Sequence, residues 1–346
     1  MILTVTPNPA IDMTYYVESF ERGESLRVDT GIARAGGKGL NVARVARQVG
    51  GDTLALTTAG GETGHELEAD LIASALPYRL VPVAAATRRS VAVVEAAHRS
   101  TTIMNERGAA LTGAEWRALL AAATEQLGAP NRSGAGQIGA GQIDAGQTAA
   151  GPTGAGQAGA GATGAVPGCV VGSGSLPPGV PDAFYADLVT AAAARGLPVV
   201  IDAVGPALLK AARAGADVVK PNRAELLETT GESDPAVGAR ILLDAGARLV
   251  LVSLGEDGML IIDAHDVAHP LHARLPRALD GNPTGAGDAA VAAVAISLAE
   301  GALDPVTILR RATAWSAAAV LMPVAGAIAE NYRELERLLI LEPWTA

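Results

Sequence analysis

Strand-like and helix-like segments alternate regularly over residues 169–253, and this alternation constrains the fold more than any other feature of the chain. Short apolar runs typical of buried strands occur at residues 169–172, 198–202, 217–220 and 248–253. Segments with apolar residues at helical spacing lie between them, at residues 182–194, 206–214, 223–229 and 235–245. Strands that alternate with helices of this length form parallel sheets covered on both faces. We therefore predict a doubly wound α/β fold.

The remaining segments extend this pattern at both ends. Strands are predicted at residues 2–6 and 53–59, and a hairpin-like edge at residues 259–262 and 266–270. Helices are predicted at residues 36–50, 64–75, 114–127, 285–300, 305–321 and 332–339, with Thr112 as an N-cap. Polar ends of parallel strands gather at one edge of such a sheet, so Asp202, Asn222, Ser253 and the loop at Gly285 are expected to converge.

A second, smaller sheet is predicted from residues with period-two alternation. Residues 12–17 and 25–33 alternate polar and apolar side chains around a turn at Gly23, and residues 90–95 and 100–105 form two more strand-like runs. We expect each two runs to form an antiparallel pair, and the two pairs to join in a small β-sheet lid, over about residues 12–34 and 88–105, that stands off the main body.

Composition limits the class of protein. The chain has 346 residues, 49% of them hydrophobic but 3% aromatic, so its core is expected to consist mainly of Ala, Val and Leu in a single domain over residues 1–346. A net charge of −10 argues against general binding to nucleic acid or anionic membranes. The single cysteine, Cys169, excludes an internal disulfide. With neither a signal-peptide pattern nor a membrane-length apolar run, a cytoplasmic protein is expected.

Residues 129–167 differ in kind from the rest. They repeat Gly-Ala-Gly-Gln-like units with almost no charge or large apolar side chain. Such a composition cannot bury enough surface to offset its ordering entropy. We predict a disordered low-complexity insertion, tolerated because the cost of loop closure grows slowly with length.

The stretch from Asp280 to Asp288 carries the strongest chemical signal. Gly285, Ala286 and Gly287 are expected at the N-terminus of the following helix, where free backbone N–H groups and the helix dipole favour an anion. Asp288 beside them could accept a proton from a hydroxyl while the amides stabilise a transferred phosphoryl group. The alternative is that Asp288 only caps the helix.

Six motifs in order resemble the ribokinase-like (PfkB) carbohydrate kinases, especially the 1-phosphofructokinase and tagatose-6-phosphate kinase branch. They are Thr6-Pro-Asn-Pro-Ala-Ile-Asp12, Ala35-Gly-Gly-Lys-Gly-Leu-Asn41, Gly172-Ser-Gly-Ser-Leu-Pro-Pro-Gly179, Val219-Lys-Pro-Asn-Arg-Ala-Glu225, Val252-Ser-Leu-Gly-Glu-Asp-Gly258 and Thr284-Gly-Ala-Gly-Asp288. The resemblance covers nearly all of the chain outside residues 129–167. It implies a ribokinase-like sheet with a lid that closes over the sugar and pairs between subunits as a homodimer.

The resemblance also assigns roles to these residues. It implies that Asp288 is the catalytic base, that Gly285–Gly287 form the anion hole, and that Glu225 helps to hold Mg²⁺ beside ATP, partly through water. The residues implied to border the nucleotide are Lys220, Asn222, Ser253 and Gly255. For Glu225 the alternative is a first-turn acid favoured by the helix dipole.

The sugar-binding candidates form an acid-and-amide set. Asp12 can accept hydrogen bonds from two hydroxyls, Gly36 and Gly37 let the backbone approach a ligand, and Asn41 can bond hydroxyls from the first turn of its helix. A phosphate on the substrate needs cations, for which Lys38, Arg27 and Arg88 are the candidates; the alternative is that they are solvated surface charges. Arg89 is adjacent to Arg88, which leaves open which of the two faces the phosphate.

The predicted function is Mg-ATP-dependent phosphorylation of a phosphorylated ketohexose, with fructose 1-phosphate as the first substrate to expect. Tagatose 6-phosphate and fructose 6-phosphate are alternative substrates for the same phosphoryl transfer. A further alternative is an unphosphorylated sugar. A different class is a catalytically silent sugar-binding protein on the same fold.

Overall fold

The main sheet has ten strands, and its central part is parallel. The computed structural model describes residues 1–21, 23–98, 100–128 and 166–345. The strand order is β14-β13-β12-β11-β10-β9-β8-β1-β4-β5. Every pairing from β11 to β5 is parallel, and those among β11, β12, β13 and β14 are antiparallel. The strands are β1 (Ile2–Thr6), β4 (Thr53–Ala59), β5 (Tyr78–Pro82), β8 (Cys169–Ser173), β9 (Val199–Asp202), β10 (Val218–Val219), β11 (Leu249–Ser253), β12 (Met259–Asp263), β13 (Leu271–Arg274) and β14 (Ile340–Pro343).

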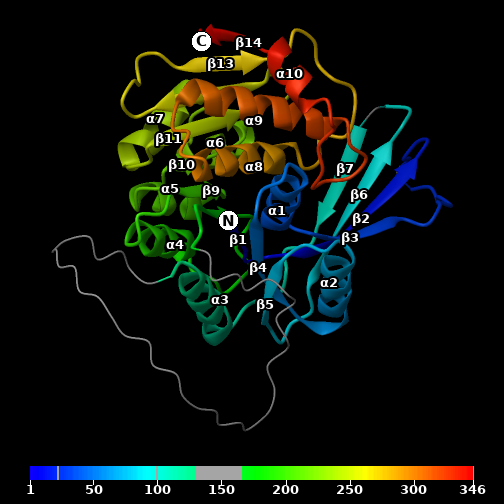
Figure 1. The fold of residues 1–346 in the computed structure, drawn as a ribbon. Helices are drawn as coiled ribbons and strands as arrows, with labels where there is room; N and C mark the ends of the chain where they lie inside the picture. The colour runs from blue at the N-terminus through cyan, green and yellow to red at the C-terminus, as the bar shows by residue number, and fades with distance from the viewer. Residues whose placement is uncertain (22, 99, 129–165, 346) are drawn as a thin grey trace, which may run out of the picture.

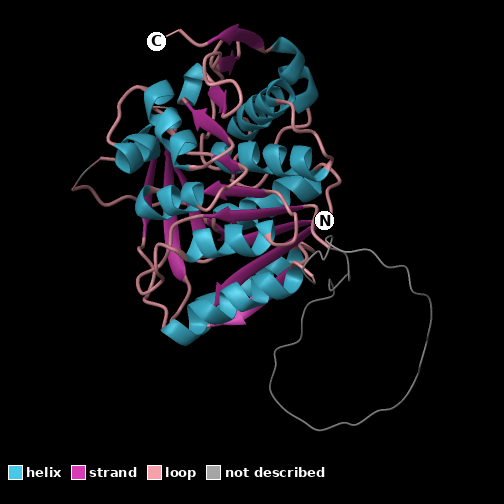
Figure 2. Ribbon diagram, turned by 90° about the vertical axis from the view of Figure 1, so that its left-hand side faces the viewer, coloured by secondary structure: helices cyan, strands magenta, loops and turns pink. Residues whose placement is uncertain are grey.

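Helices cover both faces of this sheet, which confirms the doubly wound α/β fold (Figure 2). One face packs against α1 (Lys38–Gln48), α8 (Ala286–Ala299), α9 (Pro305–Val320) and α10 (Tyr332–Leu338). The other packs against α3 (Gly113–Gln126), α4 (Phe184–Ala193), α5 (Gly205–Arg213), α6 (Arg223–Thr230) and α7 (Pro235–Ala245). α8 is buried along most of its length, since its small alanines and valines allow close packing between the sheet and α9.

A second sheet of four strands stands beside the main body (Figure 1). It consists of β3 (Ile32–Gly36), β2 (Ala10–Val17), β6 (Arg88–Glu95) and β7 (Ser100–Asn105), in that order. α2 (Gly61–Ala73) and α1 join it to the body through a separate apolar cluster that includes Ile11, Leu40 and Leu67. The two predicted antiparallel pairs form, β2 with β3 and β6 with β7, and they join through β2 and β6, which run parallel. β3 and β7 take the outer positions as antiparallel partners.

Two predicted strands are displaced along the chain. The strand expected at residues 25–33 occupies Ile32–Gly36, since Gly36 and Ala35 pair with Ala10 and Ile11 while residues 24–30 are exposed. The strand expected at residues 266–270 begins only at Leu271. Residues 264–270 instead form polar turns in which His269 bonds Asp266, and Pro270 has no N–H for a ladder. β5 and β14 were not predicted.

Several local predictions are confirmed. Thr112 caps α3 in a capping box with Glu115, and Gly37 (φ 116°) precedes α1.

No helix within the described ranges has the length and apolar character that crossing a membrane requires. The predicted insertion at residues 129–167 lies outside the described residues except for its last two, Val166 and Pro167.

Candidate active site

Asp288 lies in the first turn of α8, where the sequence predicts it. Gly285 is the residue before the helix and has a φ of 87°, and a Cβ built on it would lie 2.8 Å from the Cβ of Ala325, so glycine is required there. Asp288 is only 6% exposed, and its Oδ2 accepts a hydrogen bond of 2.8 Å from Nδ2 of Asn41 in α1. The carboxylate is therefore fixed in direction in the first turn of α8, where the N–H of Ala286 donates to Pro283 O at 3.2 Å.

Burial and the neighbouring Asp202 raise the pKa of Asp288 to about 7, against the opposing influence of Lys38, Asn41 and Lys220. A carboxylate with such a pKa is a base matched to neutral pH, since it is substantially ionised yet binds a proton readily. A residue that only capped the helix would accept hydrogen bonds from the backbone N–H groups of the first turn. Asp288 instead bonds a side chain of another helix.

Two lysines and a fully buried acid form an ionic cluster beside Asp288. Lys38 Nζ lies 3.1 Å from Asp202 Oδ1 and 3.0 Å from Glu225 Oε1, and Lys220 Nζ lies 3.6 Å from Asp202 Oδ1. Burial would raise the pKa of Asp202, but Lys220 and Lys38 hold it below its usual range. Burial would lower the pKa of Lys38, but the carboxylates of Asp202 and Glu225 hold it above its usual range. Asp202 and Lys38 are therefore both charged at neutral pH.

Lys220 also lies against the glycine-rich turn. A Cβ built on Gly287 would lie 3.3 Å from Lys220 Nζ, so the glycine leaves room for this ammonium group at the start of α8. Lys220 itself is 2% exposed. A cation, the N–H groups of a helix and a base thus meet at one point, which is the arrangement that transfer of a phosphoryl group requires.

The predicted nucleotide and metal residues lie at the ends of β10 and β11. Asn222 forms an isolated bridge with Ser253, and Gly255 begins the 3₁₀ turn Gly255–Asp257. Asn222 caps α6 in a capping box: Asn222 Oδ1 accepts from the backbone N–H of Glu225 at 2.8 Å, and Glu225 Oε2 accepts from that of Asn222 at 2.9 Å. Both oxygens of Glu225 thus have a protein partner, with Lys38 at Oε1.

Asp12 lines a cavity between the second sheet and the main body. A Cβ on Gly36 would come within 1.9 Å of Asp12 Oδ2, so this glycine makes room for the acid. Burial raises the pKa of Asp12 to about 6, opposed by Arg88, Ser90 and other neighbours. The other polar residues in the lining are Thr14, Arg34, Asn41, Ser90, Asn282 and Thr284. Asn41 therefore connects the cavity of Asp12 with the base Asp288.

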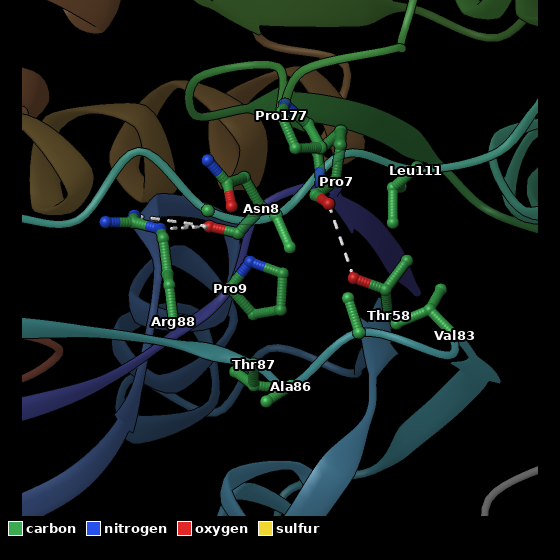
Figure 3. Close-up of a pocket in the computed structure, with 13 residues that line it drawn as sticks. Pro7, Asn8, Pro9, Thr58, Val83, Ala86, Thr87, Arg88, Leu111 and Pro177 are labelled. Carbon is green, nitrogen blue, oxygen red and sulfur yellow. Dashed lines mark hydrogen bonds between the residues drawn. The ribbon is translucent and has the colours of Figure 1, made fainter.

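The basic residues predicted for a substrate phosphate are not gathered in this cavity. Arg88 donates to Asn8 O at 3.3 Å and 3.2 Å and to Glu106 O at 3.0 Å. Figure 3 shows it against Asn8 in a second cavity, whose lining includes three prolines and three alanines but neither Asp288 nor Asp12. Arg89 points elsewhere, with a nitrogen 3.7 Å from Glu66, so Arg88 is the arginine nearer the site. Arg27 lies exposed in the connection between β2 and β3.

Two charged residues of the site were not given a role from the sequence. Asp202 was expected at the sheet edge only as the end of a strand, and its place between two lysines depends on residues far apart in the chain. Arg34 was not singled out, because the displaced strand prediction ended before it. Its position one residue before Ala35-Gly36 was the available signal.

The fold and this site define an enzyme class: a phosphotransferase that acts on an alcohol group, built on a ribokinase-like α/β fold. A family model described as pfkB family carbohydrate kinase matches residues 6–129 and 168–331, and the chain belongs to this family. Both the predicted family and the predicted kinase class are confirmed.

Curated relatives cover most of the chain. It is 32% identical to an ATP-dependent 6-phosphofructokinase isozyme 2 of Mycobacterium tuberculosis, over 98% of this chain and 89% of the relative. It is 33% identical to a 1-phosphofructokinase of Xanthomonas campestris, over 91% of this chain and 89% of the relative. A solved structure of phosphofructokinase-2 from Escherichia coli in complex with potassium aligns with a TM-score of 0.78 at 27% identity, over 97% of this chain and 98% of the other.

Proposed function

We propose that this kinase transfers the γ-phosphoryl group of ATP to a hydroxyl of a phosphorylated ketohexose, with fructose 1-phosphate as the first substrate and fructose 1,6-bisphosphate as its product. The observation that carries the proposal is the position of Asn41, which lines the cavity of Asp12 and also bonds Asp288. A polyol held by Asp12 would therefore present a hydroxyl next to the base. Relatives named 1-phosphofructokinase support the choice of substrate.

In the proposed reaction Asp288 accepts the proton of the substrate hydroxyl as its oxygen bonds to the γ-phosphorus and the bond to the leaving ADP oxygen breaks. The N–H groups of Gly285 and Gly287 would stabilise the transferred group, and that of Ala286 would join them on leaving Pro283 O, to which it now donates at 3.2 Å. The ammonium of Lys220 beside Gly287 would offset the charge of the transferred group. Lys38, held at 3.0–3.1 Å from two carboxylates, is already oriented before substrate binds.

ATP would lie across the ends of β10 and β11, over Asn222, Ser253 and Gly255, where a Cβ on Gly255 would meet open space. Mg²⁺ usually keeps several waters and binds few carboxylates directly. Each oxygen of Glu225 has a second lone pair beyond its present bond, so this acid fits a hydrated cation reached through water. Bound there, Mg²⁺ would supply charge neutralisation to the nucleotide phosphates.

The second sheet would act as a lid and as a dimer surface. Its strands and the following connection expose Tyr16, Phe20, Ile32, Ile103 and Met104, each more than 40% accessible. Such a concentration of exposed apolar side chains favours pairing with a second copy of the chain. Sedimentation of the protein tests the dimer, and a purely monomeric protein would contradict it.

A reducing cytoplasm suits the single buried thiol of Cys169.

The proposal is tested by coupled ADP release with Mg-ATP against fructose 1-phosphate, fructose 6-phosphate, tagatose 6-phosphate, fructose and ribose. Turnover of fructose 1-phosphate with the highest kcat/KM is expected. A preference for fructose 6-phosphate would assign the activity named for the Mycobacterium tuberculosis and Escherichia coli relatives. Turnover of free sugars alone would overturn the phosphosugar proposal, and sugar binding without turnover would favour a silent binding protein.

A further inference from the structure

The cavity of Asp12 contains one basic side chain in its lining, among the residues that the structure describes, and it is Arg34. Arg34 lies in β3 directly opposite Asp12 of β2 in the antiparallel register. Directly opposed residues of neighbouring strands project to the same face of a sheet. The guanidinium of Arg34 and the carboxylate of Asp12 therefore face the same cavity. The carboxylate is suited to bind hydroxyls, and the guanidinium is suited to bind an anion.

The guanidinium of Arg34 has unused hydrogen-bonding capacity. Its Nη1 donates to Ala325 O at 3.1 Å, and this is its one hydrogen bond to the described part of the chain. A guanidinium has five N–H donors in a planar fork, so four remain for a ligand. The bond to Ala325 holds the side chain across the cavity between the second sheet and the 321–327 loop.

The charge on Arg34 is incompletely compensated. Burial and the neighbouring Arg44 lower the pKa of Arg34, while Asp70 and Asp12 act in the opposite direction. Asp70 is already paired with Arg44, which also donates to Ser74 and to Ala35 O. An anion placed in the cavity would stabilise the charged guanidinium.

The other candidate cations are committed to protein partners or lie apart. Three N–H groups of Arg88 are bound to backbone carbonyls, and this residue lines the other cavity. Lys38 lies between Asp202 and Glu225. Arg27 is exposed on a connection. Among the neighbouring arginines Arg88 has the largest effect on the pKa of Asp12, but Arg34 is the one that lines this cavity and keeps N–H donors for a ligand.

We propose that Arg34 binds the phosphate that the ketohexose already carries and thereby selects phosphorylated over free sugars. This inference rests on the proposed function, since it assumes that a phosphosugar occupies the cavity of Asp12. The planar fork suits two oxygens of a phosphate monoester at once, which a lysine cannot reproduce.

The test compares Arg34→Ala and Arg34→Lys with the wild type, using the preferred phosphosugar and Mg-ATP. Loss of a charged hydrogen bond predicts that Arg34→Ala raises the KM for the phosphosugar by roughly tenfold or more, with the KM for ATP within about twofold. Arg34→Lys should recover only part of the loss. If the alanine variant lacks a cooperative unfolding transition, Arg34→Gln replaces it.

Tyr16→Phe is the matched control, because the Tyr16 hydroxyl donates at 2.5 Å to Pro323 O and so also ties the second sheet to the 321–327 loop. If Arg34 only holds that loop, Tyr16→Phe should raise the phosphosugar KM as much as Arg34→Ala, and the proposal is overturned. An unchanged phosphosugar KM in Arg34→Ala overturns the role of Arg34 alone. Absence of phosphosugar turnover in the wild type overturns the proposed function itself.

Discussion

Asn41 and Asp288 are 247 positions apart in the sequence, yet the amide of Asn41 donates a hydrogen bond of 2.8 Å to the carboxylate of Asp288. This bond joins the first turn of α1 to the first turn of α8 and sets the direction of the proposed base. It also stabilises the ionised form of Asp288, against burial and the charge of Asp202, which together raise the pKa to about 7.

Asn41→Ala is expected to shift the pH dependence of the reaction. Activity requires Asp288 in its ionised form, so kcat/KM should rise with pH through an apparent pKa near 7 in the wild type. Removing the hydrogen bond favours the protonated acid, and the acidic limb should move to higher pH. The measurement is kcat/KM from pH 5.5 to 9, and an unmoved limb would show that Asn41 does not influence the base.

Asp288→Asn should lower kcat by about 10²–10⁴-fold, the usual contribution of a general base, and it should also stabilise the fold at high pH. The folded-state pKa of about 7 lies above the ordinary 3.8, so the folded chain binds the proton more tightly than the unfolded one. The stability of the wild type therefore falls as pH rises from about 4 to about 7. Denaturant unfolding at pH 8 should show the variant to be the more stable protein, with a smaller difference at pH 4.5. A variant destabilised equally at both values would contradict the buried-acid argument.

Asp202→Asn should destabilise the protein strongly. Asp202 is fully buried and pairs with Lys38 and with Lys220, which is 2% exposed, so its loss leaves a buried ammonium without a counterion. Breaking such a buried pair costs about 3–5 kcal/mol in free energy of unfolding. Asp182→Asn is the control, since its pair with Lys210 is solvent-exposed and should contribute no more than about 1 kcal/mol. Equal losses in the two variants would argue against the buried cluster.

Gly36→Ala tests the position of Asp12. The new Cβ would lie 1.9 Å from Asp12 Oδ2, so the carboxylate must rotate out of place. We expect the KM for the sugar to rise by roughly tenfold or more, as for a lost charged hydrogen bond, with little change in the KM for ATP. Gly168→Ala is the control, because a Cβ there makes an ordinary contact of 3.4 Å with Ala299. A normal sugar KM in Gly36→Ala would remove Asp12 from the proposed sugar site.

Replacing residues 129–165 by a short Gly/Ser linker should preserve folding and activity. The flanking residues are close together, since a Cβ built on Gly128 would lie 3.4 Å from Val166 Cγ2. A short linker can therefore join them without strain, and the shorter loop costs less entropy to close. kcat, KM and the thermal midpoint measure the outcome, and a folded but inactive product would assign the segment a direct role.

The sequence by itself determined the class of fold and the outline of the site. The spacing of apolar residues that distinguishes a strand from a helix depends only on neighbours within one element. The alternation of strands and helices over residues 169–253 could therefore be read from the sequence, and it predicted the parallel sheet correctly. Gly285, with a φ of 87°, marked the turn before Asp288, whereas the reason for Gly36 is its contact with Asp12 on the neighbouring strand. Residues 25–33 show the limit of such patterns: their alternation is real, but pairing with β2 selected Ile32–Gly36.

The tertiary structure decided which charges meet. Nothing near Lys38 in the sequence identifies Asp202 and Glu225 as its partners, 164 and 187 positions away. Successive side chains of β6 point to opposite faces of the sheet, so Arg88 and not Arg89 lies on the face nearer the site. Arg34 lines the cavity because the register between β3 and β2 places it opposite Asp12. Coulomb interactions and desolvation depend on distance in space, and that distance is established only when remote segments pack together.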